Sequence, residues 1–283
     1  MSALDLDHIG IAVRDLDAAS AQFRRLGFKL TERGYHSLPP ETPGGPRPRA
    51  GTANHCAMLE RGYLELIGIS DPAYGGRLKA DIERYQGVHI VAFGTDDAGR
   101  TSRELRDRGL PIGDSRPLER PIEESDEAQL ARFEIVDFPR DLIPEGHFFA
   151  IRHLTRDLLW KPPLLAHPNG AKSLESLIIA VADPADFRTR IDRCLGVGPD
   201  EAGGFKLAAG RVSVVDGAWV AEHVPTGAPS LPYIAGISVG VADIVRTADL
   251  LATSGVPFEP RGSAVWVAPS EGCGAFVEFV AAA

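Results

Sequence analysis

Short apolar stretches alternate with amphipathic segments along this chain, and the alternation occurs four times. Each apolar stretch is predicted to form a strand that ends in aspartate: "HIGIAVRD" from residue 8, "HIVAFGTD" from 89, "SLIIAVAD" from 176 and "GISVGVAD" from 236. Residues at helical spacing follow each aspartate, up to a glycine at position 27, 109, 196 or 255. Aspartate at an N-cap and glycine after the last turn are the start and stop signals of a helix. The pattern therefore predicts four strand–helix units.

Further strands follow each predicted helix. They are read as "GTANHCAML" and "GYLELIGI" in the first unit, "GHFFAIRHLT" in the second, and "SAVWVAP" and "GAFVEFVAA" in the fourth, whereas the third is hard to trace through "FKLAAGRVSVVDGAW". The sequence thus predicts an α+β protein of four β-α-β-β-β modules. Because "LLWKPPLLAHPNG" has the prolines and Asn-Gly turn of a linker, two domains are expected: 1–157 and 173–283, joined by 158–172.

The composition limits the kinds of partner that the protein is expected to bind. A net charge of -9 and a pI near 5.4 argue against nucleic acid or an anionic membrane surface, which require basic patches. No apolar run of about eighteen residues occurs, so no membrane span is expected, and a cytoplasmic location is the default. The three cysteines are far apart, which favours neither a disulfide framework nor a zinc knuckle.

The histidine that opens the first strand stands on an unusually open face. In an extended chain His8 shares its face with Gly10 and Ala12, which leaves room for a ligand beneath the imidazole. His89 holds the corresponding place in the second copy, whereas the third and fourth copies have Ser176 and Gly236 there. Two histidines in register in one domain, and none in the other, favour a site in the first domain and a structural role for the second.

The paired β-α-β-β-β modules resemble the vicinal oxygen chelate superfamily, which includes glyoxalase I, methylmalonyl-CoA epimerase, extradiol dioxygenases and bleomycin-resistance proteins. The phrases "GTANHCAMLERGYLELIGI" and "HPNGA" are most similar to its glyoxalase-like branch. The resemblance implies two glyoxalase-like domains. It also implies a metal in a cleft lined by the first and fourth strands of two modules.

Carried onto this sequence, the resemblance assigns His8 and His89 on first strands and Glu65 on a fourth strand as ligands. Two imidazoles and a carboxylate suit Zn, Mn, Ni or Fe, whose identity stays open. The fourth strand of module two lacks the usual glutamate, and His153 is the candidate replacement, with a surface position at the strand end as the alternative. Without His153 the set resembles the facial triad of iron oxygenases.

The function implied is that of a metal-dependent enzyme acting on a small oxygenated metabolite. The metal would polarise a carbonyl and stabilise an enolate while a base, His55 or a metal-bound water, removes a proton. A structural hydrogen bond is the alternative for His55. Isomerase or lyase chemistry is expected first and ring-cleaving dioxygenation second, while the rival is a metal-free binding protein of the bleomycin-resistance type. A small-molecule substrate is the expected partner, and a homodimer is left open.

Overall fold

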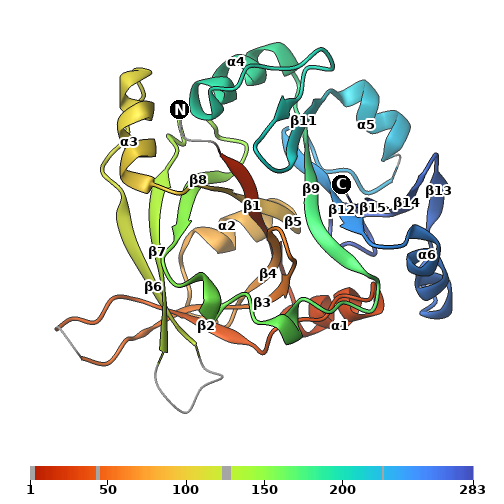
Figure 1. The fold of residues 1–283 in the computed structure, drawn as a ribbon, viewed down its shortest axis with the longest axis horizontal. Coiled ribbons are helices and arrows are strands. Elements are labelled where there is room, and N and C mark those ends of the chain that lie inside the picture. The colour runs from red at the N-terminus through yellow and green to blue at the C-terminus, as the bar shows by residue number, and fades with distance from the viewer. Residues whose placement is uncertain (1–3, 43–44, 123–128, 225, 283) are drawn as a thin grey trace.

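The computed structural model describes residues 4–282 except 43–44, 123–128 and 225, and it confirms the paired modules. The N-terminal domain contains the first two modules, which Figure 1 shows in red to green. Its elements are β1 (Asp5–Val13), α1 (Leu16–Arg25), β2 (Gly34–Ser37), β3 (Arg49–Met58), β4 (Tyr63–Ile69), α2 (Arg77–Arg84), β5 (Gly87–Gly94), α3 (Ala98–Asp107), β6 (Arg116–Ile122), β7 (Gln129–Asp137) and β8 (His147–His153).

The first strands of the two modules, β1 and β5, pair antiparallel at the centre of this domain. In each module the last strand runs parallel to the first, so β4 lies beside β1 and β8 beside β5. Pairing continues outward through β3 and β2 on one side and through β7 and β6 on the other. An ion pair between Arg47 and Glu119 joins the two sides. The modules therefore curve around a shared interior.

The C-terminal domain repeats this plan with one departure. Its elements are β9 (Ala171–Ala180), α4 (Pro184–Leu195), β10 (Phe205–Lys206), β11 (Arg211–Val215), α5 (Gly217–His223), β12 (Tyr233–Val241), α6 (Ile244–Thr253), β13 (Glu259–Arg261), β14 (Ala264–Val267) and β15 (Phe276–Ala281). In the described part of the third module only two strands follow α4. The second of them, β11, runs parallel to β9 and is the last strand of the module, and the helix α5 follows it as α2 follows β4. This is the module whose strands were hard to trace in the sequence.

The predicted start and stop residues of the four helices are confirmed, except that one N-cap lies one residue later. Asp15, Asp183 and Asp243 cap α1, α4 and α6 by accepting backbone N–H groups on their side chains. The cap of α3 is Asp97 and not Asp96, which the repeat alignment had used. All four stop glycines adopt positive φ.

The segment between the domains is packed. A short 3₁₀ turn spans Arg156–Leu158 and another spans Pro162–Leu164. Buried His167 contacts the carbonyl of Met58 through Nε2 at 2.7 Å, and buried Asn169 donates to the carbonyl of Leu26 at 2.9 Å. The "HPNGA" phrase thus ties the connection to the first module, and its polar groups are used structurally.

One apolar core runs through both domains beneath the helices. A β-bridge between Ile234 of β12 and Val88 of β5 continues the sheet from one domain to the other, and a second bridge pairs Arg61 with Ser173. Across the same boundary Arg190 forms a bidentate ion pair with Glu145, whose side chain is buried. No helix among the described residues is long and apolar enough to cross a membrane.

Candidate functional site

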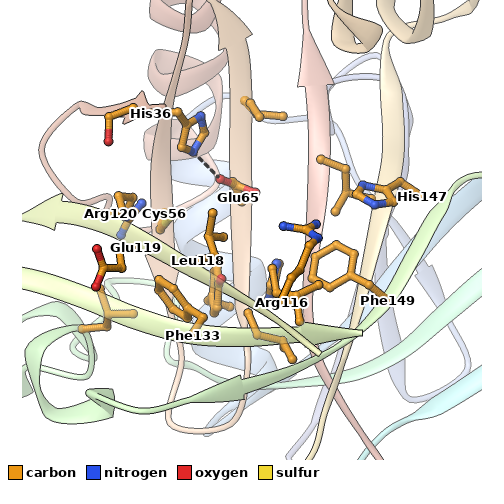
Figure 2. Close-up of a pocket in the computed structure, with 18 of the residues that line it drawn as sticks. His36, Cys56, Glu65, Arg116, Leu118, Glu119, Arg120, Phe133, His147 and Phe149 are labelled. Carbon is orange, nitrogen blue, oxygen red and sulfur yellow. Dashed lines mark ion pairs between the residues drawn. The ribbon is translucent and has the colours of Figure 1, made fainter. Parts of the chain in front are cut away.

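The concave interior of the N-terminal domain holds a cavity of about 260 Å³ (Figure 2). Most of its wall is apolar and comes from both modules: Met58, Ile67, Ile90, Phe133, Ile135 and Phe149 are examples. The charged and histidine side chains along the wall are His8, His36, Glu65, Arg116, Glu119, Arg120 and His147. Tyr63, Glu65 and Ile67 of β4 all line it, as strand alternation predicted. The arrangement suits a small molecule with an apolar body and a few polar atoms.

His8 reaches the cavity from β1 and is held there by its neighbour in the chain. Its Nδ1 lies 2.6 Å from Oδ1 of Asp7, and both side chains are buried. The ring of Tyr63 stacks on the imidazole with centroids 4.2 Å apart. These two contacts fix the plane of the ring and place its Nδ1 on the carboxylate. In the neutral ring Nδ1 then carries the proton, and Nε2 is left as an acceptor.

Asp7 is the second member of this group, and His153 is the third. Nε2 of His153 lies 3.0 and 3.1 Å from the two carboxylate oxygens of Asp7. Burial raises the pKa of Asp7, but the charge and hydrogen bonds of His153 and His8 outweigh burial and hold it well below its usual range. Asp7 is therefore an ionised carboxylate shared by two imidazoles.

A bulge in β1 explains how adjacent residues can make this contact. The pairing of β1 with β5 passes from Leu6 to His8 and skips Asp7. A bulge leaves the extra residue unpaired and re-aims its side chain, whereas an unbroken strand would send Asp7 and His8 to opposite faces. Strict alternation therefore concealed Asp7 in the sequence. The signal that could have found it is an aspartate directly before the strand histidine.

Glu65 faces the same cavity and is satisfied by neighbours on β2 and β3. The amide of Asn54 donates to Oε1, which lies 3.5 Å from Nε2 of His36, and Figure 2 marks this ion pair with a dashed line. Arg120 of β6 donates to the other end of the Asn54 amide at 3.3 Å. Burial raises the pKa of Glu65, but His36, His8 and Asn54 together lower it to about 2. Glu65 was predicted from the sequence, whereas its partners His36 and Asn54, and Arg120 that contacts Asn54, were not.

His89 does not meet His8, which overturns one expected ligand. Its ring stacks on Tyr85 with centroids 4.0 Å apart, its Nε2 contacts the Tyr85 carbonyl at 2.9 Å, and it is absent from the cavity wall. The alignment was wrong by one residue: His8 lies seven positions before its helix cap Asp15, and the residue seven before Asp97 is Ile90. A slip of one residue exchanges the faces of a strand.

His55 is also corrected. Its neighbour on β3, Cys56, lines the cavity, so His55 points to the opposite face, and its Nδ1 contacts the carbonyl of Thr31 at 2.9 Å. This is the structural hydrogen bond given as the alternative. His153 is brought into the site, but as a partner of Asp7 and not as a residue of the cavity wall.

The corresponding positions of the two modules show which ligands the cavity offers to a metal ion. The positions of module two that correspond to His8 and Glu65 hold Ile90 and Phe149, which cannot ligate. Within the described residues, Asp7, His8 and His153 are the one group of three potential ligands whose donor atoms lie within 4.8 Å of one another. The cavity wall thus supplies two donors of the expected set, His8 and Glu65. His8 also belongs to the three-residue group, whose other members do not line the cavity.

The sequence and the fold were compared with known proteins. The sequence profile of a family described as a glyoxalase-like domain matches residues 6–195. No curated protein matches the chain.

Three solved structures share the fold at low identity. A hypothetical protein from Staphylococcus aureus has a TM-score of 0.65 at 14% identity, covering 98% of this chain and 98% of that one. A mutant of 4-hydroxymandelate synthase from Streptomyces coelicolor gives 0.61 at 13%, covering 99% and 92%. A xylose isomerase-like TIM barrel/4-hydroxyphenylpyruvate dioxygenase fusion protein gives 0.60 at 12%, covering 98% of this chain and 48% of that one.

At such identities these structures establish the fold and leave the chemistry to the site itself. The matched profile spans more than half of the sequence, and the paired modules have the architecture of the vicinal oxygen chelate superfamily. The chain therefore belongs to the glyoxalase-like domain family of that superfamily.

Proposed function

We propose that the N-terminal cavity binds a small oxygenated organic molecule and that His8 moves a proton on it, in an isomerase- or lyase-type reaction. The observation that carries this proposal is the hydrogen bond of 2.6 Å between Asp7 and His8. A carboxylate on Nδ1 selects the tautomer whose Nε2 can accept a proton, and it stabilises the imidazolium that forms. His8 lines the cavity, so a bound molecule would lie beside its ring.

The two cations on the wall suit the same chemistry, and the second carboxylate there, Glu119, is paired with Arg47. Removing a proton beside a carbonyl places negative charge on the carbonyl oxygen, and nearby fixed cations stabilise it in the transition state. Arg116 and Arg120 both line the cavity. Arg120 is oriented by Asn54 at 3.3 Å, and Arg116 is held by Asp137 at 2.6 Å, so neither cation has to reorganise greatly when charge develops. The apolar wall would hold the rest of the substrate.

Hydrogen–deuterium exchange tests the proposal without knowledge of the natural substrate. A panel of small 2-oxo acids, 3-oxo acids and hydroxyketones is incubated with the protein in D₂O, and NMR follows exchange at the carbon next to the carbonyl. The wild-type protein should accelerate exchange for at least one compound, and His8→Gln should abolish the acceleration. His89→Phe, which alters a histidine outside the cavity, is the matched control and should retain it.

Two outcomes would count against proton transfer. Exchange that His8→Gln leaves intact would remove His8 from the chemistry. Saturable binding of panel compounds by NMR, without exchange of any of them by the wild-type protein, would favour the metal-free binding function that the superfamily also contains.

A divalent metal ion is a second candidate element of this site, and the Asp7, His8 and His153 group favours it. One carboxylate and two imidazoles are donors that Zn, Mn, Ni and Fe accept, and an ion there would replace the protons that the three side chains now share. Such an ion would supply Lewis-acid chemistry, and with iron the ring-cleaving oxygen chemistry expected second from the sequence.

Elemental analysis of protein purified without a histidine tag separates the two candidates. About one equivalent of a transition metal, lost in both Asp7→Asn and His153→Gln, would support the metal centre. Wild-type protein that takes up none of the four ions, while still catalysing exchange, would reject the metal and leave proton transfer by His8 standing.

A further inference from the structure

The C-terminal domain has a cavity of its own, although the sequence predicted a structural role for this domain. The cavity measures about 440 Å³ and is lined by residues of the strands β9, β11, β12 and β15 and of the helix α5, among others. Its polar wall consists of Ser176, Ser213, Ser238, Glu278, His223 and Arg261. Three aromatic side chains, Trp219, Trp266 and Phe276, complete it.

The polar residues form a row across neighbouring strands. Ser176 is paired with Ser238 between β9 and β12, and Ser238 is paired with Glu278 between β12 and β15. The hydroxyl of Ser176 donates to that of Ser238 at 2.9 Å, which in turn donates to Oε2 of Glu278 at 2.6 Å. Both protons therefore point along the row toward the carboxylate.

The position of Glu278 in the repeat is that of Glu65 in the first domain. Gly10, the partner of Glu65, lies five residues before the cap Asp15, and Ser238, the partner of Glu278, lies five before the cap Asp243. The domain thus keeps the carboxylate of the fourth strand. No ion pair joins Glu278 to a cationic side chain in the described part of the chain.

The two basic side chains of the cavity wall, Arg261 and His223, are already engaged. The guanidinium of Arg261 contacts the His223 carbonyl at 3.3 Å and Glu259 at 3.0 Å, and its carbon lies 3.7 Å from the centre of the Trp266 ring. Nδ1 of His223 donates to the Trp219 carbonyl at 2.9 Å, so its other nitrogen is an acceptor in the neutral ring.

Along the row of Ser176, Ser238 and Glu278, acceptor capacity and negative charge stay free. Oε1 of Glu278 has no hydrogen-bond partner among the described residues, and the Ser176 oxygen keeps its lone pairs because its proton goes to Ser238. A carboxylate in a half-buried, aromatic cavity is stabilised by a cation that it can bind directly. A primary ammonium group offers three donors and no acceptor, which matches this wall.

The aromatic residues define the rest of the ligand. The Trp219 and Phe276 rings lie 6.1 Å apart between centroids, and those of Trp266 and Phe276 lie 6.0 Å apart. Flat side chains of this kind, buried at Trp266 and Phe276 and half-buried at Trp219, accommodate an apolar body and attract a nearby cation through their ring faces.

We propose that the C-terminal cavity is a second ligand site, for a small organic amine whose ammonium group binds Glu278 and whose apolar body packs against Trp219 and Phe276. This site is independent of the proton transfer proposed for His8.

Calorimetry with three probes of similar shape tests the proposal on the full chain: 2-phenylethylamine, 2-phenylethanol and 3-phenylpropionate. The amine should bind best, the alcohol more weakly, and the carboxylate not measurably. Glu278→Gln keeps the shape of the side chain and should weaken amine binding by roughly tenfold or more, because it removes a charge-assisted hydrogen bond. Glu65→Gln changes the equivalent carboxylate of the first domain and should leave amine binding unchanged.

The proposal is overturned by any of three results. One is failure of the amine to bind wild-type protein at millimolar concentration. Another is equal affinity of wild type and Glu278→Gln for the amine, with circular dichroism showing both folded. The third is preferential binding of the carboxylate probe, which would make Arg261 the recognition group.

Discussion

Oδ1 of Asp7 lies 2.6 Å from Nδ1 of His8, although the two residues are neighbours on one strand. The β-bulge at Asp7 makes this contact, because it removes Asp7 from the pairing with β5 and turns its carboxylate toward the adjacent imidazole. The same carboxylate also contacts Nε2 of His153, which lies on β8, the last strand of the domain. The bulge in β1 and the position of β8 together bring His8 and His153 to the carboxylate of Asp7.

Asp7→Asn tests this relationship directly. The amide has the size of the carboxylate but carries no charge, so it cannot stabilise the imidazolium of His8. We expect proton exchange of a panel compound to fall by about 10²–10⁴-fold, the usual contribution of a positioned acid or base, while the affinity for the compound changes little. NMR measures the rate and the affinity in one titration. A parallel loss of affinity and rate would instead indicate that the cavity itself has been disturbed.

Most of the fold could be predicted because its signals are local. Aspartate caps, stop glycines and eight-residue apolar stretches recur with each module, and they place the helices α1, α3, α4 and α6 within a few residues. The site could be predicted only in part, because it depends on strand register. Glu65 follows from simple alternation on a regular strand. Asp7 and His89 lie at irregular pairings, where alternation fails.

His89→Phe tests whether His89 is a structural residue or a metal ligand. Phenylalanine keeps the ring contact with Tyr85 but leaves the Tyr85 carbonyl without its 2.9 Å partner. An unsatisfied buried carbonyl costs about 1–3 kcal/mol, so the free energy of unfolding should fall by that amount. Ligand binding in the N-terminal cavity and bound metal should be unchanged. Loss of metal from His89→Phe as large as that from Asp7→Asn would restore His89 as a ligand.

Glu65 should make the stability of the protein depend on pH in the acid range. Its pKa falls from the ordinary 4.5 to about 2 on folding, so its contribution is present above 4.5 and is lost as the pH falls toward 2. At about 1.4 kcal/mol per pKa unit the contribution is about 3 kcal/mol. The difference in unfolding free energy between wild type and Glu65→Gln should therefore narrow between these two pH values in urea titrations. The change of this difference with pH reports the ionisation of Glu65, because any effect of the new amide on packing does not depend on pH.

Glu222→Gln is the matched control for this titration. Its side chain is 79% exposed, so its difference from wild type should stay small and nearly constant with pH. A Glu65→Gln difference that is equally flat would mean that Glu65 is not held as an ion by His36 and Asn54.

Gly27 and Gly109 occupy the same place in two modules, after α1 and α3, but only Gly27 packs against the other domain. Both have positive φ, 84° and 74°. A Cβ at Gly109 would meet nothing within 4 Å, whereas one at Gly27 would lie 2.8 Å from Cβ of Asn169 and 2.8 Å from Leu250. Gly109→Ala should therefore cost only the left-handed strain, roughly 1–2 kcal/mol.

Gly27→Ala adds overpacking to the same strain, and overpacking typically costs about 1–3 kcal/mol more. Urea unfolding should place Gly27→Ala clearly below Gly109→Ala, and Gly255→Ala, whose site is equally open, should match Gly109→Ala. The Asn169 backbone also donates to the Gly27 carbonyl, so an added methyl group has to displace the segment that joins the two domains. Equal destabilisation of all three variants would contradict this prediction. It would show that the "HPNGA" segment can move away from an added methyl group at no cost, and so does not hold the first module against the second domain.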